Sequence, residues 1–319
     1  MKLIVMIPCL NEEATLPTVL RGIPKKIAGI DSIEVLVIDD GSADKTVAVA
    51  KKLGVQHFIR HAQNRGLAHS FRDGLQGALE LGADIIVLTD GDNQYPQERI
   101  PDLVRPILDG IADTVIADRH TQDIAHFSPF KKFLQRFGTK VLNMAAGTNV
   151  PDATSGFRAF SKDAAFQLNL VNRYSFGMET LIQHGRKRHA IAVIDIKTNP
   201  KTRESRLFKS SFQHARKNAI IIVRTYVMYS PLAVFITLGV FFLVVGLIPF
   251  AHYIYLVFTV KNPNGAHHLQ SLIIGAVLLI ASFVSFTLGV VADLIGINRS
   301  LIEDTLENTK RDRFNVKNR

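Results

Sequence analysis

Short apolar runs alternate with longer amphipathic stretches over the first two hundred residues. Each run is almost continuously apolar, as expected for a strand of a parallel sheet whose two faces are both covered by helices. The stretches between the runs are helix-like, which is typical of a mostly parallel sheet wrapped by helices. We therefore predict an α/β domain with strands near residues 3–7, 34–38, 55–59, 84–88 and 113–117.

A different pattern begins near residue 230. Two apolar stretches, at about 231–258 and 270–297, are separated by a short polar loop. Each stretch exceeds the ~20 residues that a helix needs to cross the ~30 Å hydrocarbon core of a bilayer. We predict a transmembrane helical hairpin, with a helical pair buried in a soluble core as the alternative. Pro249 would kink the first helix without breaking it.

These patterns divide the chain into four parts. We expect a catalytic domain at 1–207, a basic juxtamembrane helix at 208–229, two transmembrane helices within 230–297, and a basic tail at 298–319 that contains a short charged helix. The juxtamembrane segment mixes basic and apolar positions. That mixture suits either an interfacial amphipathic helix or an ordinary surface helix.

Charge sets the expected orientation. The formal net charge is +10, with basic residues concentrated before and after the two apolar stretches and only Lys261 in the loop between them. Cytoplasmic segments beside membrane helices carry excess Lys and Arg, so the catalytic domain and both termini are expected in the cytoplasm. No aromatic-interleaved basic platform accompanies the charge, so we do not expect nucleic-acid binding.

Three smaller features fit this organisation. The single Cys9 excludes an intramolecular disulfide and lies in an apolar strand pattern, which indicates a reduced, buried thiol. The N-terminal apolar run is too short for a signal peptide and is interpreted as the first strand. Glycines in the apolar stretches would allow close helix contacts and the packing of subunits in a homo-oligomer. They are Gly239, Gly246, Gly275 and Gly289.

Polar residues follow several of the predicted strands. Ligands of open α/β sheets bind at the carboxyl edge of the strands, so chemistry is expected at these positions. The polar segments are Pro8–Glu13, Asp39–Asp44, Asp90–Gln94 and the later turn Asp152–Arg158.

Asp90 and Asp92 lie two positions apart at the end of a predicted buried strand. Two such carboxylates repel each other unless a cation or a positive partner is present. Their hard oxygen atoms favour Mg²⁺ or Mn²⁺, which would bridge carboxylates to substrate phosphates and neutralise a leaving diphosphate. Gln94 offers a carbonyl oxygen as a further ligand. A solvated loop is the alternative for an isolated Asp-x-Asp.

Five motifs follow one another along the first part of the chain: PCLNEE, VIDDGSADKT, NRGLAHSFRDGL, LTDGDNQYP and SGFR. In this order they resemble the motifs of family 2 glycosyltransferases, and the resemblance covers roughly residues 1–210. It implies a GT-A (Rossmann-like) fold and a metal-dependent transfer of a hexose or an N-acetylhexosamine. The third and fourth motifs look like those of polyprenyl-phosphate sugar synthases, typified by dolichyl-phosphate mannosyltransferase.

The resemblance implies a nucleotide site at the first three motifs. Asp40 would contact the base, with Asp39 beside it. An acidic side chain accepts hydrogen bonds from uracil and guanine alike, so the donor is a UDP- or a GDP-sugar. Gly66 would let the backbone approach the nucleotide, although Asn64-Arg65-Gly66 also suits a turn before a helix. The other residues that would line the nucleotide pocket are Pro8, Asn11 and Glu12.

Within the fourth motif, the resemblance places Asp90 and the adjacent Gly91 on the sugar and ribose side. It leaves Asp92 and Gln94 to hold the metal. From the second motif, Ser42 and Asp44 are better explained by capping of the next helix than by ligand contact.

Three further residues are candidates for the acceptor. Arg119 resembles an arginine that contacts phosphate, with a surface arginine as the alternative. Asp152 would orient the acceptor, or act as a base if the acceptor is a hydroxyl. Arg158 would bind the acceptor phosphate or pair with Asp152 to hold the turn. Arg203 and Arg206 align with a basic loop that closes over the diphosphate in related enzymes, although Arg-Glu-Ser-Arg departs from the usual Gly-x-Ser-Lys.

A lipid phosphate acceptor would simplify the chemistry. A phosphate monoester has a second pKa near ~6 and is largely ionised at neutral pH, so no strong general base is needed. We therefore expect an inverting transfer to a membrane polyprenyl phosphate, serving cell-envelope or protein glycosylation. The alternatives are a non-processive transferase acting on a lipid or glycan hydroxyl, and a non-catalytic nucleotide-binding protein that recruits a partner to the membrane.

Two other classes fit the sequence poorly. Processive polymer synthases use a Gln-x-x-Arg-Trp motif, and this chain has no tryptophan. A dehydrogenase would carry Gly-x-Gly-x-x-Gly after the first strand, where this chain has Pro-Cys-Leu-Asn-Glu-Glu.

Overall fold

The computed structural model describes residues 1–319 except 121–128, 171–175, 201–222, 225, 260–268 and 318–319. The chain divides into two compact units. Residues 1–222 together with 303–319 form one unit, here called the sheet unit. Residues 223–302 form the other, here called the helical unit.

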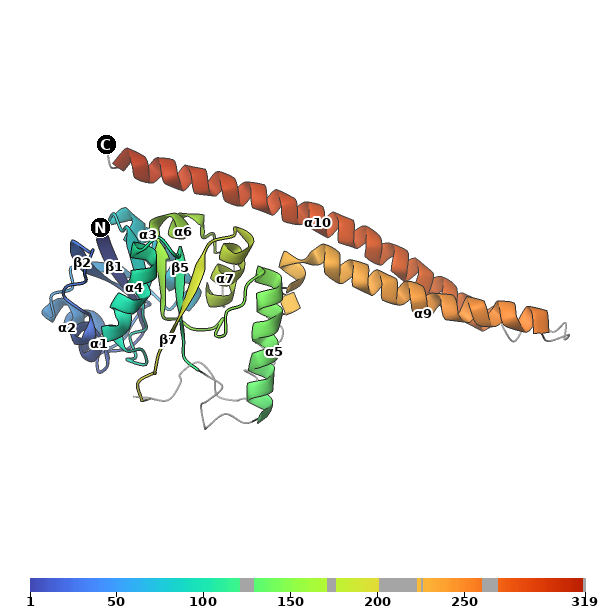
Figure 1. The fold of residues 1–319 in the computed structure, drawn as a ribbon, viewed down its shortest axis with the longest axis horizontal. Coiled ribbons are helices and arrows are strands. Elements are labelled where there is room, and N and C mark those ends of the chain that lie inside the picture. Colours follow the sequence, from blue (N-terminus) through green and yellow to red (C-terminus); the bar gives the residue numbers. More distant parts are fainter. Residues whose placement is uncertain (121–128, 171–175, 201–222, 225, 260–268, 318–319) are drawn as a thin grey trace. The chain divides into compact units, whose positions relative to one another are not determined.

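A seven-stranded sheet is the centre of the sheet unit, in the order β3-β2-β1-β4-β6-β5-β7. β6 runs antiparallel to β4 and β5, and the other neighbouring strands are parallel. Figure 1 shows the sheet, with β1, β2, β5 and β7 labelled. The strands are β1 (Lys2–Cys9), β2 (Ser32–Asp39), β3 (His57–Arg60), β4 (Ile85–Leu88), β5 (Thr114–Asp118), β6 (Arg158–Ser161) and β7 (Ile191–Asp195).

Helices connect these strands and cover both faces of the sheet. They are α1 (Leu16–Gly22), α2 (Thr46–Lys52), α3 (Leu67–Glu80), the 3₁₀ turn η1 (Gln97–Arg99), α4 (Ile100–Leu108), α5 (Pro129–Ala146), α6 (Lys162–Gln167) and α7 (Phe176–Arg186).

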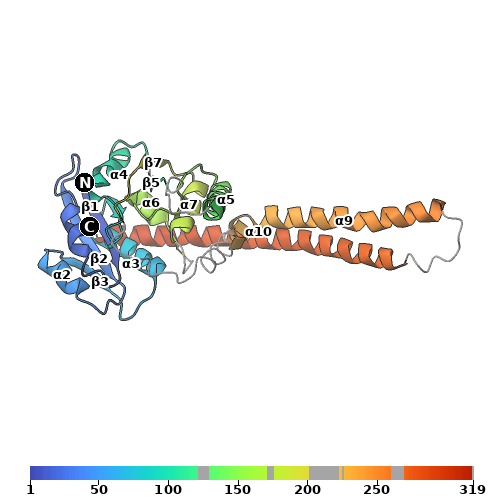
Figure 2. The same cartoon turned by 90° about the horizontal axis from the view of Figure 1, so that it is seen from below.

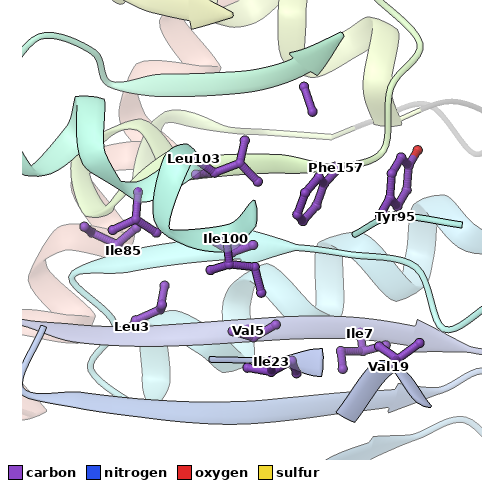
Figure 3. Close-up of a cluster of buried hydrophobic side chains, with 14 of the residues drawn as sticks. Leu3, Val5, Ile7, Val19, Ile23, Ile85, Tyr95, Ile100, Leu103 and Phe157 are labelled. Carbon is purple, nitrogen blue, oxygen red and sulfur yellow. The ribbon is translucent and has the colours of Figure 1, made fainter. Parts of the chain in front are cut away.

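Each face of the sheet has its own hydrophobic core. Along β1, Leu3, Val5 and Ile7 belong to the cluster that packs under α1 and α4, which Figure 3 shows. Ile4 and Met6 belong to the opposite cluster, which packs against α3 and α6. All five side chains are fully buried. A strand that is covered on both faces must be apolar at every position, which is why it appears in the sequence as a continuous run.

The predicted α/β fold is confirmed, and the five predicted runs correspond to β1 to β5. β3 occupies His57–Arg60, slightly later than the predicted 55–59. β6 and β7 were not predicted. β6 is four residues long and begins with an arginine, so it carries no apolar pattern. It is a strand because its backbone pairs with both neighbours.

The helical unit contains two long apolar helices, α9 (Pro231–Thr259) and the first part of α10 (Leu269–Lys317). Their spans are Pro231–Leu256 and Gln270–Arg313, both long enough to cross a bilayer, and the most apolar 18-residue windows of these spans have mean hydropathies of 2.7 and 2.4. Only 11% and 22% of their most apolar windows are buried. So little burial does not fit the alternative of a helical pair enclosed in a soluble core.

Glycines lie where α9 and α10 touch, and the two helices run side by side in Figure 2. A Cβ added at Gly239 would lie 2.7 Å from the ring of Phe286, and one at Gly275 would lie 2.6 Å from the ring of Phe250. The glycines therefore allow close contact between α9 and α10 of one chain, and the packing of subunits through them stays a prediction. The glycines at the contact are Gly239, Gly246, Gly275 and Gly289.

The end of α10 packs on the sheet unit instead of forming a separate tail. Lys310 Nζ donates to the carbonyl oxygen of Leu168 at 2.8 Å and to Asn169 Oδ1 at 2.6 Å. Arg311 donates to Asp163 at 2.8 Å. No pattern in the sequence predicts this contact, because alternating acidic and basic residues also suit a solvated helix.

We expect Lys310→Met to loosen this terminal segment. The change keeps an apolar side chain but leaves two acceptors without their donor, at a cost of about 1–3 kcal/mol. Hydrogen exchange of the amides in 303–317 should accelerate about tenfold, since each 1.4 kcal/mol changes an equilibrium tenfold. Asn308→Ala, on the same stretch with an exposed side chain, is the control. If the exchange rates of these amides in Lys310→Met equal those of the wild type, the contacts of Lys310 do not stabilise the terminal segment.

Candidate functional site

The loops after β1 and β2 meet at the carboxyl edge of the sheet. Parallel pairing places Cys9 opposite Asp39 at the ends of these strands. Asn11 then receives the N–H of Ala43 on its Oδ1 at 2.8 Å, and its own N–H donates to Ser42 Oγ at 2.9 Å. Glu12 is 5% exposed. Two segments thirty residues apart in the chain thus form one surface.

The smaller predictions for this edge have mixed outcomes. Cys9 is a buried free thiol, as predicted, and burial raises its pKa. Asp44 accepts the N–H of Thr46 at the start of α2, at 2.9 Å, which fits the predicted capping. Ser42 instead links the two loops through Asn11. Pro8 is buried at the end of β1.

Asp39 and Asp40 are buried carboxylates that organise the next loops. Asp39 accepts the N–H of Ser42 at 3.0 Å. Asp40 accepts the backbone N–H groups of Arg65 and Gly66 at 2.8 and 2.9 Å, one on each oxygen. His61 Nδ1 lies 2.7 Å from the same carboxylate. Asp40 therefore fixes the loop that Gly66 was predicted to contribute to the nucleotide site.

A cavity of about 330 Å³ opens beside these carboxylates, lined by Gly41, Ser42, Arg60, His61 and Ala62. Its volume falls within the ~300–1,000 Å³ of small-molecule sites. Gly41 has φ +79°, and a Cβ there would lie 2.7 Å from the carbonyl carbon of Gln63. Only glycine fits that turn.

The loop after β4 carries the predicted metal ligands. Asp92 Oδ1 accepts the N–H of Gln94 at 3.1 Å, and Asp92 Oδ2 lies 2.8 Å from Gln94 Nε2. The nitrogen and oxygen of an amide are distinguished only by their bonding. A half-turn of the Gln94 amide puts its oxygen where the nitrogen is. Two ligand oxygens of an octahedral Mg²⁺ or Mn²⁺ are about 3 Å apart, so this pair fits a hard cation.

Asp90 and Gly91 lie close to the first and last motifs. A Cβ added at Gly91 would lie 3.0 Å from Cys9 Sγ, and one at Gly156 would lie 3.3 Å from Asp90 Oδ2. Small residues at these two positions let the loops approach closely. Tyr95 completes the contact, because its hydroxyl oxygen accepts the N–H of Gly156 at 2.8 Å.

A second group of metal-type ligands lies at the ends of β5 and β7. Asp118, His120 and Asp195 offer ligand atoms within 4.8 Å of one another. His120 Nε2 lies 3.2 Å from Asp195 Oδ1, and its backbone N–H donates to Asp118 at 2.9 Å. The sequence analysis missed this group, since the register that pairs Asp118 with Asp195 comes from the unpredicted β7.

Arg119 and Asp152 form a bidentate ion pair. Arg119 Nε and Nη2 donate to the two oxygens of Asp152 at 2.7 and 3.1 Å, and Nη2 also donates to Thr154. Burial raises the pKa of the Asp152 carboxyl, but the hydrogen bonds and charge of Arg119 outweigh it and hold that pKa below its ordinary value. A carboxylate with a lowered pKa is a weak base, so this geometry favours an orienting role for Asp152.

Arg158 does not fit its predicted contact with an acceptor phosphate. Its side chain is fully buried. The guanidinium donates to three backbone carbonyl oxygens and to the hydroxyl of Thr180, at 2.7 to 2.9 Å. Arg158 therefore holds the Asp152–Arg158 turn through its backbone carbonyls, and the pairing with Asp152 that was predicted for Arg158 is made by Arg119 instead. Arg203 and Arg206 lie outside the described residues.

The ion pair predicts a pH dependence. Because the folded-state pKa of Asp152 lies below the unfolded value of about 3.9, the ionised carboxylate stabilises the folded protein at pH values above about 3.9. This stabilisation is lost as pH falls through the folded-state pKa. Asp152→Asn should therefore lower the unfolding temperature at pH 6–7. The gap to the wild type should narrow as pH falls below about 4, first because the unfolded chain protonates Asp152 and then, at lower pH, because the folded protein does. Thermal unfolding across pH 3–7 measures this, and a constant gap would contradict it.

Comparison with known proteins places this chain in a family. The profile described as Glycosyl transferase family 2 matches residues 4–168, more than half of the chain. A dolichyl-phosphate N-acetylglucosaminyltransferase of Methanococcus voltae, named for UDP-N-acetylglucosamine, is 30% identical over 215 residues, covering 60% of this chain and 84% of its own. An undecaprenyl-phosphate mannosyltransferase of Micrococcus luteus is 27% identical over 187 residues, covering 56% and 75%.

Solved structures agree on the fold. Glucosyl-3-phosphoglycerate synthase of Mycobacterium tuberculosis with bound UDP superimposes with a TM-score of 0.56 and 23% identity, covering 70% of this chain and 80% of its own. The same enzyme with Mn²⁺, UDP and phosphoglyceric acid gives 0.55 and 21%, covering 71% and 77%. The predicted GT-A architecture is confirmed, and the chain belongs to glycosyl transferase family 2.

Proposed function

We propose that the chain is an inverting glycosyltransferase that moves a sugar from a UDP- or GDP-sugar to a membrane polyprenyl phosphate. The observation that carries the proposal is the hydrogen bond of 2.8 Å between the Tyr95 hydroxyl and the N–H of Gly156. It joins the loop that holds Asp92 and Gln94 to the turn that holds Asp152. A donor site and an acceptor site would thereby share one edge of the sheet.

The donor nucleotide would lie over the ends of β1, β2 and β3. The cavity beside Asp39 and Asp40 would take the base. Asn11, Glu12 and Gly66 would border it through the loops described above, and Asp90 with Gly91 would face the ribose and sugar. The oxygens of Asp40 already accept two backbone N–H groups. Asp40 would therefore act on the base mainly by shaping the loop around it.

Asp92 and Gln94 would hold Mg²⁺ or Mn²⁺. When bound, such a cation supplies positive charge for a leaving diphosphate. The group Asp118, His120 and Asp195 lies at the ends of β5 and β7, whereas the loop after β4 follows the strand that pairs with β1, beside the proposed nucleotide site. We therefore assign the donor's cation to the loop after β4.

The acceptor would be bound beside Arg119, whose side chain is 21% exposed next to the buried Asp152. An oxygen of the lipid phosphate forms the new bond to the anomeric carbon. The bond from that carbon to the diphosphate oxygen breaks, and its electron pair leaves with the nucleoside diphosphate. Attack from the opposite side inverts the anomeric centre. Arg119 would screen the phosphate charge, and Asp152 would hold Arg119 in place.

The two apolar helices support a lipid acceptor. A polyprenyl chain leaves the bilayer at ~0.8 kcal/mol per exposed CH₂, so an enzyme that is itself anchored can reach the headgroup without extracting the lipid. The relatives named for dolichyl- and undecaprenyl-phosphate transfer support the same acceptor class. A product of this kind would serve cell-envelope or protein glycosylation.

The transfer is tested with the purified full chain, Mn²⁺ or Mg²⁺, and a panel of UDP- and GDP-sugars. We expect release of nucleoside diphosphate from one donor only when polyprenyl phosphate is present. Asp92→Asn should reduce that rate at least about a hundredfold, because it removes the negative charge of a cation ligand. Asp102→Asn, which alters an exposed carboxylate paired with Arg99, is the matched control.

Two arms separate the alternatives. Equal release with unphosphorylated polyprenol would indicate a hydroxyl acceptor. No release from any donor, together with nucleotide binding that survives Asp92→Asn, would favour the non-catalytic recruitment role.

We further propose that the sheet unit and both termini lie in the cytoplasm, from the Lys and Arg on either side of the apolar stretches. A reporter that is active only in the cytoplasm, fused after Arg319 in cells, should be active. Activity of an exported reporter at the same position would reverse the assignment.

A further inference from the structure

Asn199, which follows β7 in the chain, contacts three consecutive backbone carbonyl groups of the loop that carries Asp92 and Gln94. Asn199 Nδ2 donates to the carbonyl oxygens of Asn93 and Tyr95 at 3.1 and 3.2 Å. The backbone N–H of Asn199 donates to the carbonyl oxygen of Gln94 at 2.9 Å. Asn199 therefore spans the whole stretch Asn93–Tyr95.

This loop has a backbone that needs support. Asn93 has φ +61°, in the left-handed region. A residue with a side chain adopts that region at a cost of about 1–2 kcal/mol, although Asn tolerates it better than most. Three neighbouring carbonyl groups that lack donors would add to this cost. The bonds from Asn199 offset both terms.

The internal bonds of the loop cannot replace this support once a cation binds. In the structure Gln94 Nε2 lies 2.8 Å from Asp92 Oδ2, and this contact helps to close the loop. To ligate a cation, the Gln94 amide must turn its oxygen inward, and the contact with Asp92 changes from attraction to repulsion between two oxygens. The bonds from Asn199 go only to backbone carbonyls, so they persist in both states.

The segment that carries Asn199 is attached to the sheet three residues earlier. The N–H of Ile196, the first residue after β7, donates to the carbonyl oxygen of Asp118 at 2.9 Å and continues the pairing with β5. Ile196 is 3% exposed. On the other side of the loop, the Tyr95 ring stacks on Phe157 with centroids 5.2 Å apart. The loop is thus clamped between two rigid parts of the same unit.

We infer that Asn199 is a positioning residue for the cation site, holding the Asn93–Tyr95 backbone so that Asp92 and Gln94 can bind one cation together. This inference rests on the proposed function, because it takes Asp92 and Gln94 as ligands. Asn199 acts through the loop and does not itself touch the cation.

The test measures binding of Mn²⁺ alone to the purified full chain, by the electron paramagnetic resonance signal of free Mn²⁺. Loss of an outer partner of a metal ligand typically lowers metal affinity 10–100-fold, so Asn199→Ala should raise the apparent Kd for Mn²⁺ by at least about tenfold. Asn199→Ser, which keeps one short donor, should give an intermediate loss. If Asn199→Ala does not fold, Asn199→Ser alone tests the effect on Mn²⁺ affinity.

The matched control is Asn169→Ala. Asn169 Nδ2 also donates to a backbone carbonyl, that of Glu303 at 3.2 Å, but at the contact with the end of α10. We expect it to lower the unfolding temperature without changing Mn²⁺ affinity. In the transfer assay, Asn199→Ala should raise the KM for Mn²⁺ and regain most of the wild-type kcat at saturating Mn²⁺.

The outcomes separate this inference from the proposed function. If Asp92→Asn binds Mn²⁺ as tightly as the wild type does, the cation site does not lie in this loop. The assignment of the cation under the proposed function and the role of Asn199 would then both be overturned. Binding that is lost in Asp92→Asn but stays within twofold of the wild type in Asn199→Ala and Asn199→Ser would overturn the role of Asn199 alone. If Asn199→Ala lowers kcat by the same factor at every Mn²⁺ concentration, the role of Asn199 would also be overturned, because this result would indicate a general structural defect.

Discussion

The parallel pairing of β1 with β2 and with β4 is the constraint on which the rest of the site depends. Parallel strands end at the same edge, so their following loops converge without any further instruction. The apolar residues that bury both faces of β1 therefore also determine where the polar residues after it must lie. The core and the site therefore both depend on the hydrogen-bonded pairing of β1 with its two neighbours, and a shift in the register of this pairing would disturb both.

Buried carboxylates then convert this convergence into fixed geometry. Asp39 and Asp40 are almost fully buried, yet their oxygens accept backbone N–H groups, so their burial is compensated. The loop after β4 is treated differently. Its carbonyl groups accept hydrogen bonds from Asn199, and the side chains of Asp92 and Gln94 bond each other. Side chains that bond each other can be redirected toward a ligand at little cost, whereas those that hold the backbone cannot.

The two arginines near the Asp152 turn show the same division. Arg158 satisfies its guanidinium entirely with protein oxygens inside the unit, while Arg119 shares a carboxylate at the rim. A charge that is buried and fully bonded supports the fold, and a charge that is bonded on one side only retains the capacity to meet an anion. Burial, which no sequence motif states, distinguishes the two.

The sequence by itself determined the α/β class, the five parallel strands, the two apolar helices and the family, because each is written in local periodicity or in contiguous motifs. The tertiary structure alone decided that β6 enters the sheet antiparallel between β4 and β5, that the end of α10 packs on the sheet unit, and that Asn199 reaches the loop more than a hundred residues before it. Arg158 could be singled out from its motif but not assigned, since SGFR specifies neighbours along the chain and says nothing of depth. The physical reason is common to all of these cases. Periodicity reports which face of an element is buried, whereas contacts between distant segments depend on how those faces are assembled in three dimensions.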